Sequence, residues 1–259
     1  MIDRALCIGI NAYGNGSDLA GCVNDAQEWA VLLSQRGAQG VQLFDGDATR
    51  WNILAAMTTL VRQLGRGQTG VITYSGHGTW VPDEDGDESY HRDEALCPVD
   101  LWDNGVITDD ELFEVFTSRV YGSRLVFISD SCHSGTVNRF ASPLRPTGRR
   151  VRFLPPAAFL DGARLDRARA LPAVRAGRSR TSALTLAGCR DDEFSYDASF
   201  DGRANGAFTR VALDELDGLP QEASYADWRR AISWKLPSQD YPQTPQLQGT
   251  ASQKRWPVL

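Results

Sequence analysis

The sequence predicts an α/β protein whose central sheet is mainly parallel and covered by helices on both faces. Short runs rich in Val, Ile, Leu or Phe alternate with longer stretches whose apolar residues recur at helical spacing. Parallel strands need long crossover connections, and these are usually helices that pack on the sheet. At 259 residues the chain is long enough for one large domain of this kind or for two small ones.

The expected elements follow one another along most of the chain. We predict strands at 4–10, 41–44, 69–75, 124–130 and 183–188. We predict helices at 18–36, 49–65, 109–119, 206–216 and 224–236. Asp109 and Asp110 favour the start of the third helix because carboxylates are stabilising near a helix N-terminus. A Pro-rich tail ends the chain, and there is no internal repeat.

The stretch 138–182 breaks this alternation because it shows neither a clear strand nor a core helix. It is rich in Pro and Arg, and a stretch of this length inside a compact domain is usually functional or disordered. We therefore read 1–259 as a single domain in three parts: 1–137, a linker at 138–182, and 183–259. The alternative reading of the linker is a plain solvated insertion.

Composition excludes several classes of protein. A net charge of −6 gives no support to nucleic-acid binding, and no window has the roughly 20 apolar residues of a membrane span. We find no signal-peptide pattern and expect a cytoplasmic protein. The five cysteines form no CxxC pair, which argues against a disulfide framework or a zinc site. Charge is divided, however: 81–111 carries twelve acids against one arginine, whereas 141–181 carries ten arginines against two acids.

Two of the predicted strands end at residues that can act together in catalysis. The run at 69–75 leads into Gly76-His77-Gly78, and the run at 124–130 leads into Ser131-Cys132. Open α/β sheets place their sites at the carboxyl ends of parallel strands. A histidine there can take the thiol proton and make Cys132 a nucleophile. The backbone amides of Gly78 and Cys132 are candidates for an oxyanion hole, since glycine leaves its amide uncrowded.

Plainer interpretations apply to each residue in isolation. A single cysteine is more often a small buried hydrophobe, and a single histidine is more often structural. Cys7 and Cys189 fall in strand-like runs and are expected in the core. His133 competes for the role of base, but a residue next to the nucleophile on an extended chain points the other way. The pairing of His77 and Cys132 at matching strand ends favours catalysis.

The surrounding motifs resemble those of the caspase-like cysteine peptidases, most closely the metacaspases and their prokaryotic relatives. The likeness begins with Tyr74-Ser75-Gly76-His77-Gly78 and Asp130-Ser131-Cys132-His133-Ser134-Gly135. It extends to the segments 21–26, 93–100, 109–112 and 242–246, and so covers nearly the whole chain outside the Arg-rich linker.

This resemblance implies a caspase-type three-layer α/β/α sandwich in which 1–137 is similar to a large subunit and 183–259 to a small one. It implies that His77 is the base and Cys132 the nucleophile. It also implies a pocket for the residue before the scissile bond, formed by Asp25, Asp130, Ser75 and Cys22. Two carboxylates suit an arginine, or a lysine, and repel an aspartate. We therefore expect protein or peptide substrates with a basic residue there, and a monomeric enzyme.

Relatives of this kind often bind calcium, and the resemblance places its ligands at Asp93, Asp109 and Asp110. Calcium prefers several hard oxygen ligands, which suits the acidic segment. A further family aspartate, however, corresponds to Arg139 in this sequence, and a cation there would oppose the metal. The chemistry itself requires no cofactor. The acidic run 83–88 lacks the ligand spacing of an EF-hand and reads as a solvated loop.

If the pocket accepts arginine, the linker is a substrate tethered beside Cys132. We expect activation by cleavage there, by the protein itself or by another basic-specific peptidase, and we expect the uncut basic loop to cover the pocket. The candidate sites lie in breaker-rich stretches: Arg149, Arg150, Arg152, Arg178 and Arg180. Two alternatives remain: a catalytically silent regulatory or adaptor module, and a cysteine hydrolase acting on another kind of bond.

Overall fold

A six-stranded sheet forms the centre of the molecule. The computed structural model describes residues 1–84, 91–133, 149–171 and 182–259. The sheet has the order β12-β9-β7-β3-β1-β2, and its strands are β1 (Arg4–Gly9), β2 (Gln39–Phe44), β3 (Thr69–Ser75), β7 (Arg124–Asp130), β9 (Leu184–Ala187) and β12 (Gln246–Gln248). Neighbouring strands are parallel except at the edge, where β12 runs antiparallel to β9.

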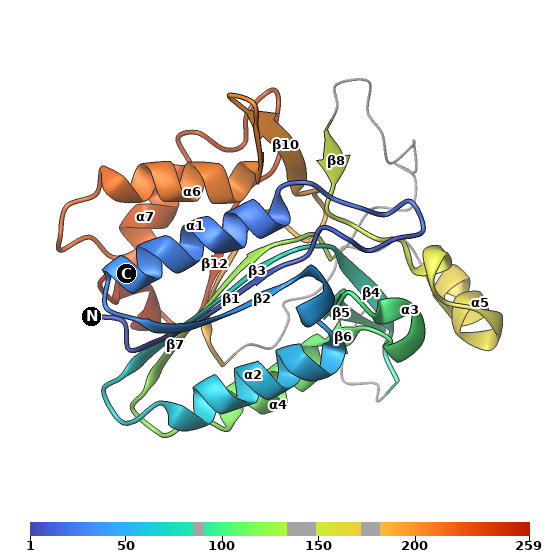
Figure 1. Ribbon diagram of the computed structural model, residues 1–259, viewed down its shortest axis with the longest axis horizontal. Coiled ribbons are helices and arrows are strands. Elements are labelled where there is room, and N and C mark those ends of the chain that lie inside the picture. Colours follow the sequence, from blue (N-terminus) through green and yellow to red (C-terminus); the bar gives the residue numbers. More distant parts are fainter. Residues whose placement is uncertain (85–90, 134–148, 172–181) are drawn as a thin grey trace.

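Helices cover both faces of this sheet (Figure 1). The helices α1 (Cys22–Gln35), α6 (Ala207–Asp217) and α7 (Tyr225–Ile232) lie on one face, and α2 (Arg50–Gln63) and α4 (Asp109–Thr117) lie on the other. One apolar cluster fills each interface, with Trp29 and Trp228 edge to face in one and Phe116 against Phe127 in the other. The three-layer α/β/α arrangement expected from the sequence is therefore confirmed.

Local sequence explains where several of these elements begin and why the central strands are apolar. Strands β1, β3 and β7 are buried along almost their whole length because helices cover both of their sides. Thr108 and Glu111 form a reciprocal capping box at the start of α4, and Ser224 and Asp227 form another at the start of α7. Thr49 caps α2 by accepting a hydrogen bond from the Asn52 amide.

Two small antiparallel sheets, which sequence periodicity did not reveal, lie beyond the central sheet. One has the order β4-β5-β6 and consists of β4 (Gly78–Pro82), β5 (Arg92–Leu96) and β6 (Ile107–Thr108). The other has the order β11-β10-β8 and consists of β8 (Arg150–Val151), β10 (Tyr196–Phe200) and β11 (Arg203–Gly206). Short elements complete the described chain: α3 (Leu101–Asn104), α5 (Gly162–Ala170), η1 (Asp45–Asp47), η3 (Pro156–Ala158) and η4 (Gln253–Arg255).

The linker 138–182 holds more secondary structure than its sequence pattern indicates. Its described part contains β8, η3 and α5. Helix α5 is hard to predict because arginines separate its few apolar residues. Among its residues Ala168 is buried, and Leu165 is half-buried against a small apolar cluster that includes Trp80 and Phe153. Among the described helices, none has the length and hydrophobicity required to cross a membrane.

Candidate active site

The two predicted strand ends lie side by side at the carboxyl edge of the central sheet. Strands β3 and β7 are parallel neighbours, and Ser75 is opposite Asp130 in their register. His77 and Cys132 therefore follow the last paired residues at the same distance along each strand. The backbones remain close beyond the sheet: a Cβ added to Gly78 would lie 2.2 Å from the Cys132 carbonyl oxygen. Only glycine allows this approach.

The His77 imidazole is buried and held by its Nε2 atom. Nε2 lies 2.7 Å from the Ser17 carbonyl oxygen, and the ring packs against Tyr13 with the centroids 4.7 Å apart. A carbonyl only accepts hydrogen bonds, so Nε2 carries the proton and Nδ1 is the basic nitrogen. Nδ1 has no hydrogen-bond partner among the described residues. Burial lowers the pKa of His77 to about 4, so the ring is neutral at pH 7.

The Cys132 thiol is also buried and lies against the backbone of Ser195. Its sulfur accepts a hydrogen bond from the Ser195 amide rather than bonding to His77 Nδ1. The competing base candidate, His133, is bound elsewhere: its Nδ1 lies 3.1 Å from the Ala95 carbonyl oxygen and its Nε2 lies 3.2 Å from Ser131 Oγ. His77 is thus the histidine whose free nitrogen remains available at this edge.

An extended segment of the linker runs through the site. Strand β8 pairs antiparallel with β10, and the Arg152 amide donates to the Ser195 carbonyl at 2.9 Å. The Arg152 carbonyl oxygen accepts from the amides of Gly78 at 3.0 Å and Cys132 at 3.1 Å. Beyond it, the Leu154 amide donates to the Gly78 carbonyl at 2.9 Å. The chain is therefore fixed on both sides of the Arg152–Phe153 peptide bond.

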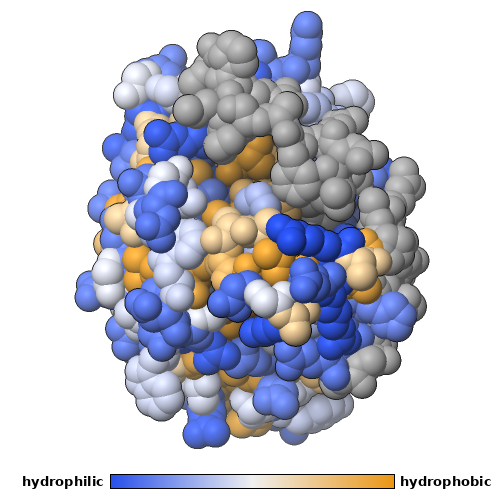
Figure 2. All heavy atoms as spheres, turned by 90° about the vertical axis from the view of Figure 1, so that its right-hand side faces the viewer, coloured by the Kyte–Doolittle hydropathy of each residue, from blue (hydrophilic) through white to orange (hydrophobic). Residues whose placement is uncertain are grey.

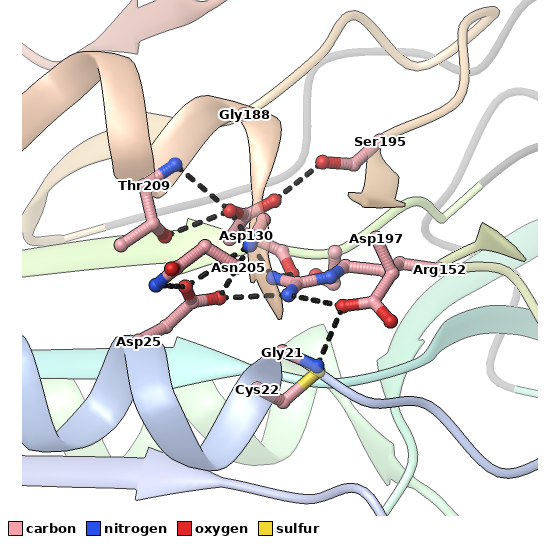
Figure 3. A network of polar contacts seen from close by, with 12 residues as sticks. Gly21, Cys22, Asp25, Asp130, Arg152, Gly188, Ser195, Asp197, Asn205 and Thr209 are labelled. Atoms are coloured by element: carbon pink, nitrogen blue, oxygen red, sulfur yellow. Dashed lines mark hydrogen bonds and ion pairs between the residues drawn. The ribbon is translucent and has the colours of Figure 1, made fainter. Parts of the chain in front are cut away.

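The Arg152 side chain enters a fully buried pocket lined by three carboxylates (Figure 3). Its guanidinium lies 2.7 Å from Asp25, 3.1 Å from Asp130 and 3.0 Å from Asp197. Burial opposes the charged guanidinium, but Asp130 and the other acids outweigh it and raise the pKa of Arg152. Burial raises the pKa of Asp25 to about 7, although Arg152 draws it back down.

The pocket carboxylates are held by neighbouring polar groups. Asp130 accepts from the Thr209 hydroxyl at 2.7 Å and the Thr209 amide at 3.0 Å, and also from the Ser195 hydroxyl. Asp25 accepts from Asn205 Nδ2 at 2.9 Å. Asp197 accepts from the amides of two residues just before α1, Ala20 at 2.8 Å and Gly21 at 2.9 Å. These bonds hold the acids in addition to their contacts with the Arg152 guanidinium.

A glycine completes the pocket wall. A Cβ at Gly206 would lie 2.1 Å from Asp130 Oδ2 and 2.5 Å from the Arg152 guanidinium. No side chain fits there while the pocket holds an arginine. The Gly206 amide also donates to Asp25 at 3.0 Å.

The structure places the predicted pocket residues in two groups. Asp25 and Asp130 contact Arg152 directly, and Cys22 lies next to them at the start of α1. Burial raises the pKa of the Cys22 thiol well above its usual range. Ser75 is buried at the end of β3, opposite Asp130 in the sheet register.

Sequence analysis missed the residues contributed by the C-terminal third of the chain and by the loop before α1. They are Ser17, Ser195, Asp197, Asn205 and Thr209. Asp197 and Asn205 lie in the short strands β10 and β11, and Ser195 directly precedes β10; these strands form only through long-range pairing. Thr209 lies in α6 and Ser17 in the loop before α1, where no local pattern connects them with the site. The Ser195-Tyr196-Asp197 run is a sequence signal that could have found two of the five.

The proposed calcium ligands lie away from this pocket. Asp93 is in β5, while Asp109 and Asp110 begin α4. Within the described ranges, no group of three or more His, Cys, Asp or Glu side chains is arranged to hold a metal ion. The calcium site therefore stays a prediction, and we derive no step through calcium. Arg139 and most of the acidic run 83–88 lie outside the described residues.

The candidate cleavage residues have different surroundings. Arg149 contacts Asp240, Arg150 donates to the Asp18 carbonyl, and Arg152 occupies the pocket. Arg178 and Arg180 lie outside the described residues. The face on the right of Figure 1 is shown in Figure 2, where hydrophobic and strongly hydrophilic residues lie side by side.

Comparisons with known proteins agree with this geometry. The family model described as "Metacaspase, peptidase C14 domain" matches residues 3–140. Metacaspase-1 of Cryptococcus neoformans var. neoformans serotype D (strain JEC21) is 32% identical over 286 residues, which cover 94% of this chain and 61% of that protein. Metacaspase-1 of Mycosarcoma maydis is 32% identical over 280 residues, covering 94% of this chain and 69% of that protein.

A solved structure extends the similarity to nearly every residue. Protein GSU0716 from Geobacter sulfurreducens is 30% identical, has a TM-score of 0.75, and is matched over 98% of its chain and 99% of this one. This chain spans 61% of the length of the Cryptococcus relative. From its family model, its relatives and its caspase-like sheet, the chain belongs to the metacaspase family of cysteine peptidases.

Proposed function

We propose that this protein is a cysteine endopeptidase that cleaves after arginine, using Cys132 as nucleophile and His77 as base. We further propose that its own Arg152–Phe153 bond is its first substrate. The observation that carries this proposal is the seating of Arg152: its side chain is in the carboxylate pocket and its carbonyl oxygen is on two backbone amides. Polarisation of a carbonyl by two such donors is what acyl transfer requires.

Arginine suits this pocket better than lysine does. The three acids approach the guanidinium from different sides, and a planar fork of five N–H donors can bond to several carboxylates at once. A lysine ammonium is a compact point charge on a flexible stem and would leave one of the acids without a close partner. We therefore expect cleavage after Arg to exceed cleavage after Lys, and no cleavage after Asp.

The proposed reaction has two steps. The Cys132 thiol turns from Ser195, loses its proton to His77 Nδ1, and attacks the Arg152 carbonyl carbon. The negative oxygen that forms is held by the amides of Gly78 and Cys132. His77 then returns the proton to the Phe153 nitrogen, the peptide bond breaks, and Arg152 remains as a thioester that water hydrolyses.

Cleavage at this bond would also open the site. Before it, the segment ending at Arg152 occupies the pocket and excludes other substrates. Afterwards, Arg150–Arg152 is held by non-covalent contacts with β10, the carboxylates, the amides of the oxyanion hole and the Asp18 carbonyl, whereas Phe153 and Leu154 stay on β4 through Gly78 and Thr79. Departure of the new C-terminus at Arg152 would leave a pocket for arginines of other proteins.

Self-cleavage is tested by incubating the purified protein and a Cys132→Ala variant and measuring fragment masses. We expect the wild-type protein to yield a fragment ending at Arg152, and the variant to stay intact. An Arg152→Gln variant should not be cut at this position. An active wild-type protein that remains uncut would contradict self-processing and point to an upstream peptidase.

Specificity is tested with fluorogenic peptides ending in Arg, Lys, Asp or Leu, with and without calcium. Turnover of the Arg peptide that is lost in Cys132→Ala supports the proposal. If folded, precleaved protein turns over no basic peptide, the alternative of a catalytically silent adaptor module is favoured. Comparison of the calcium arms decides whether the metal is needed, independently of peptide preference.

A further inference from the structure

We propose a second cation subsite, formed by Asp240 and Tyr241, that binds a basic residue at the fourth position before the scissile bond. The inference rests on the proposed function, because Arg152 sets the register: if its bond is cut, then Arg149 is the fourth residue before the cut. The substrate class is therefore peptides with the pattern Arg-x-x-Arg.

The contacts of Arg149 carry this inference. Its guanidinium donates to the Asp240 carbonyl oxygen at 2.6 Å and to Asp240 Oδ1 at 2.6 Å. The guanidinium carbon also lies 4.9 Å from the centroid of the Tyr241 ring. Two parallel hydrogen bonds and a cation over an aromatic ring are specific for arginine.

The subsite is held by the strand that binds the substrate backbone. The Tyr241 ring packs against Phe200 and Tyr196, with centroids 5.4 Å and 6.2 Å away. Both partners lie in β10, and Tyr196 is the residue paired with Val151 of β8. The Tyr241 backbone is fixed as well, since its amide donates to Ser238 Oγ at 2.9 Å. The ring therefore keeps its position relative to the peptide when the linker leaves.

Arg150 provides the internal comparison. Like Arg149 it is half-buried, but it donates to the backbone carbonyl of Asp18 rather than to a carboxylate. A carbonyl has no net charge and also accepts from neutral donors such as glutamine, so the third position should discriminate less by charge than a carboxylate does. The fourth position, which offers a carboxylate and an aromatic face, should discriminate more.

The test uses the full-length protein, after incubation, and four fluorogenic tetrapeptides. They are Arg-Arg-Val-Arg, Gln-Arg-Val-Arg, Arg-Gln-Val-Arg and Arg-Arg-Val-Gln. Replacing the fourth-position Arg by Gln should lower kcat/KM about fivefold, while the third-position change should lower it less than twofold. Asp240→Asn should abolish the fourth-position preference. Because Asp240 is exposed, this variant keeps the fold. Glu222→Gln is the matched control, since it removes one exposed negative charge elsewhere.

The outcomes separate the two proposals. If kcat/KM falls only for the peptide ending in Gln and does not depend on the fourth residue, the subsite proposal is contradicted and the Arg endopeptidase proposal is supported. If Arg-ending peptides are not cleaved better than Arg-Arg-Val-Gln, both proposals fail, because the register on which the subsite depends is lost. A fourth-position preference that survives in Asp240→Asn but weakens in Glu222→Gln would reflect overall charge, and would also overturn the subsite.

Discussion

Arg152 and Arg149 lie three residues apart in one extended segment, yet they are bound in opposite ways. The Arg152 side chain is 0% exposed and meets three carboxylates, whereas Arg149 meets one carboxylate, on Asp240, whose side chain is 69% exposed. Charge pairs act strongly in a buried site and weakly beside water. On the proposed function, we therefore expect the inner pocket to determine whether a bond is cut and the outer contact to produce smaller differences among substrates.

The two sites also differ in the hydrogen bonds that hold their carboxylates. Besides the guanidinium, Asp130 and Asp25 accept hydrogen bonds from Thr209, Asn205 and backbone amides. A buried ion pair is favourable only when such bonds satisfy the remaining oxygens. Asp240 stands at the surface, where water solvates it equally well without a partner. Removal of one carboxylate should therefore weaken arginine binding far more in the inner pocket than at Asp240.

Among the substitutions that test the two sites, Asp25→Asn should lower kcat/KM the most. The change removes one of three buried charges and leaves the Arg guanidinium short of a partner, which typically costs about 3 kcal/mol or roughly 100-fold in affinity. We expect kcat/KM for Arg peptides to fall on the order of 100-fold. Asp240→Asn, measured beside it, should change kcat/KM only about fivefold. Equal losses in the two variants would contradict the distinction between inner and outer sites.

Replacement of Gly206 by Ala tests the shape of the inner pocket rather than its charge. The new methyl group would meet Asp130 Oδ2 at 2.1 Å and the guanidinium at 2.5 Å, so the acid and the arginine cannot both keep their places. We expect KM for Arg peptides to rise about tenfold, with thermal unfolding measured in parallel. Gly218→Ala is the control, since its nearest contact would be 3.8 Å away. An unchanged KM would contradict this prediction, because it would mean that the residues around position 206 move to accommodate the methyl group.

The sequence predicted the inner pocket only in part, for a physical reason. His77, Cys132, Asp25 and Asp130 lie at the ends of long apolar strands or at the start of a long helix, where periodicity is clear. Asp197 lies in β10, a short strand of a small sheet that forms only through pairing with distant residues. No local pattern reports such pairing.

The linker is a second region where sequence alone predicted only part of the arrangement. Its arginines indicated a tethered substrate, but five of them stood as equal candidates because composition carries no register. The hydrogen bonds of Arg152 with Ser195, Gly78 and Cys132 supply that register. The three layers and their helices, by contrast, follow from hydrophobic spacing alone, which is why the fold was predicted before the site was complete.

Lowering the pH should weaken the inner pocket by protonating Asp25. With a guanidinium in the pocket its pKa is about 7, because burial raises it and Arg152 lowers it, so the pKa is higher in the empty pocket that a peptide meets. We expect kcat/KM for Arg peptides, divided by the same quantity for Asp25→Asn, to fall at least about tenfold between pH 8 and pH 6. The ratio removes the ionisation of the thiol, and His77, with a pKa of about 4, stays neutral throughout. A ratio independent of pH would contradict this assignment.

The smallest expected effect separates Arg149 from Arg150 without using catalysis. In the uncut Cys132→Ala protein, trypsin can cut after Arg152 only when the segment leaves the pocket, so the rate follows the open population. Arg149→Gln should raise that rate about fivefold by removing the contacts with Asp240, and Arg150→Gln less than twofold, because Asp18 offers only a carbonyl. Cutting after Arg66, which is exposed in the turn before β3, serves as the internal reference. If Arg150→Gln raised the trypsin rate more than Arg149→Gln, the prediction would be contradicted. The contact with Asp18 would then hold the segment more strongly than the contact with Asp240. Asp18 lies in the same loop as Ser17, whose carbonyl binds His77.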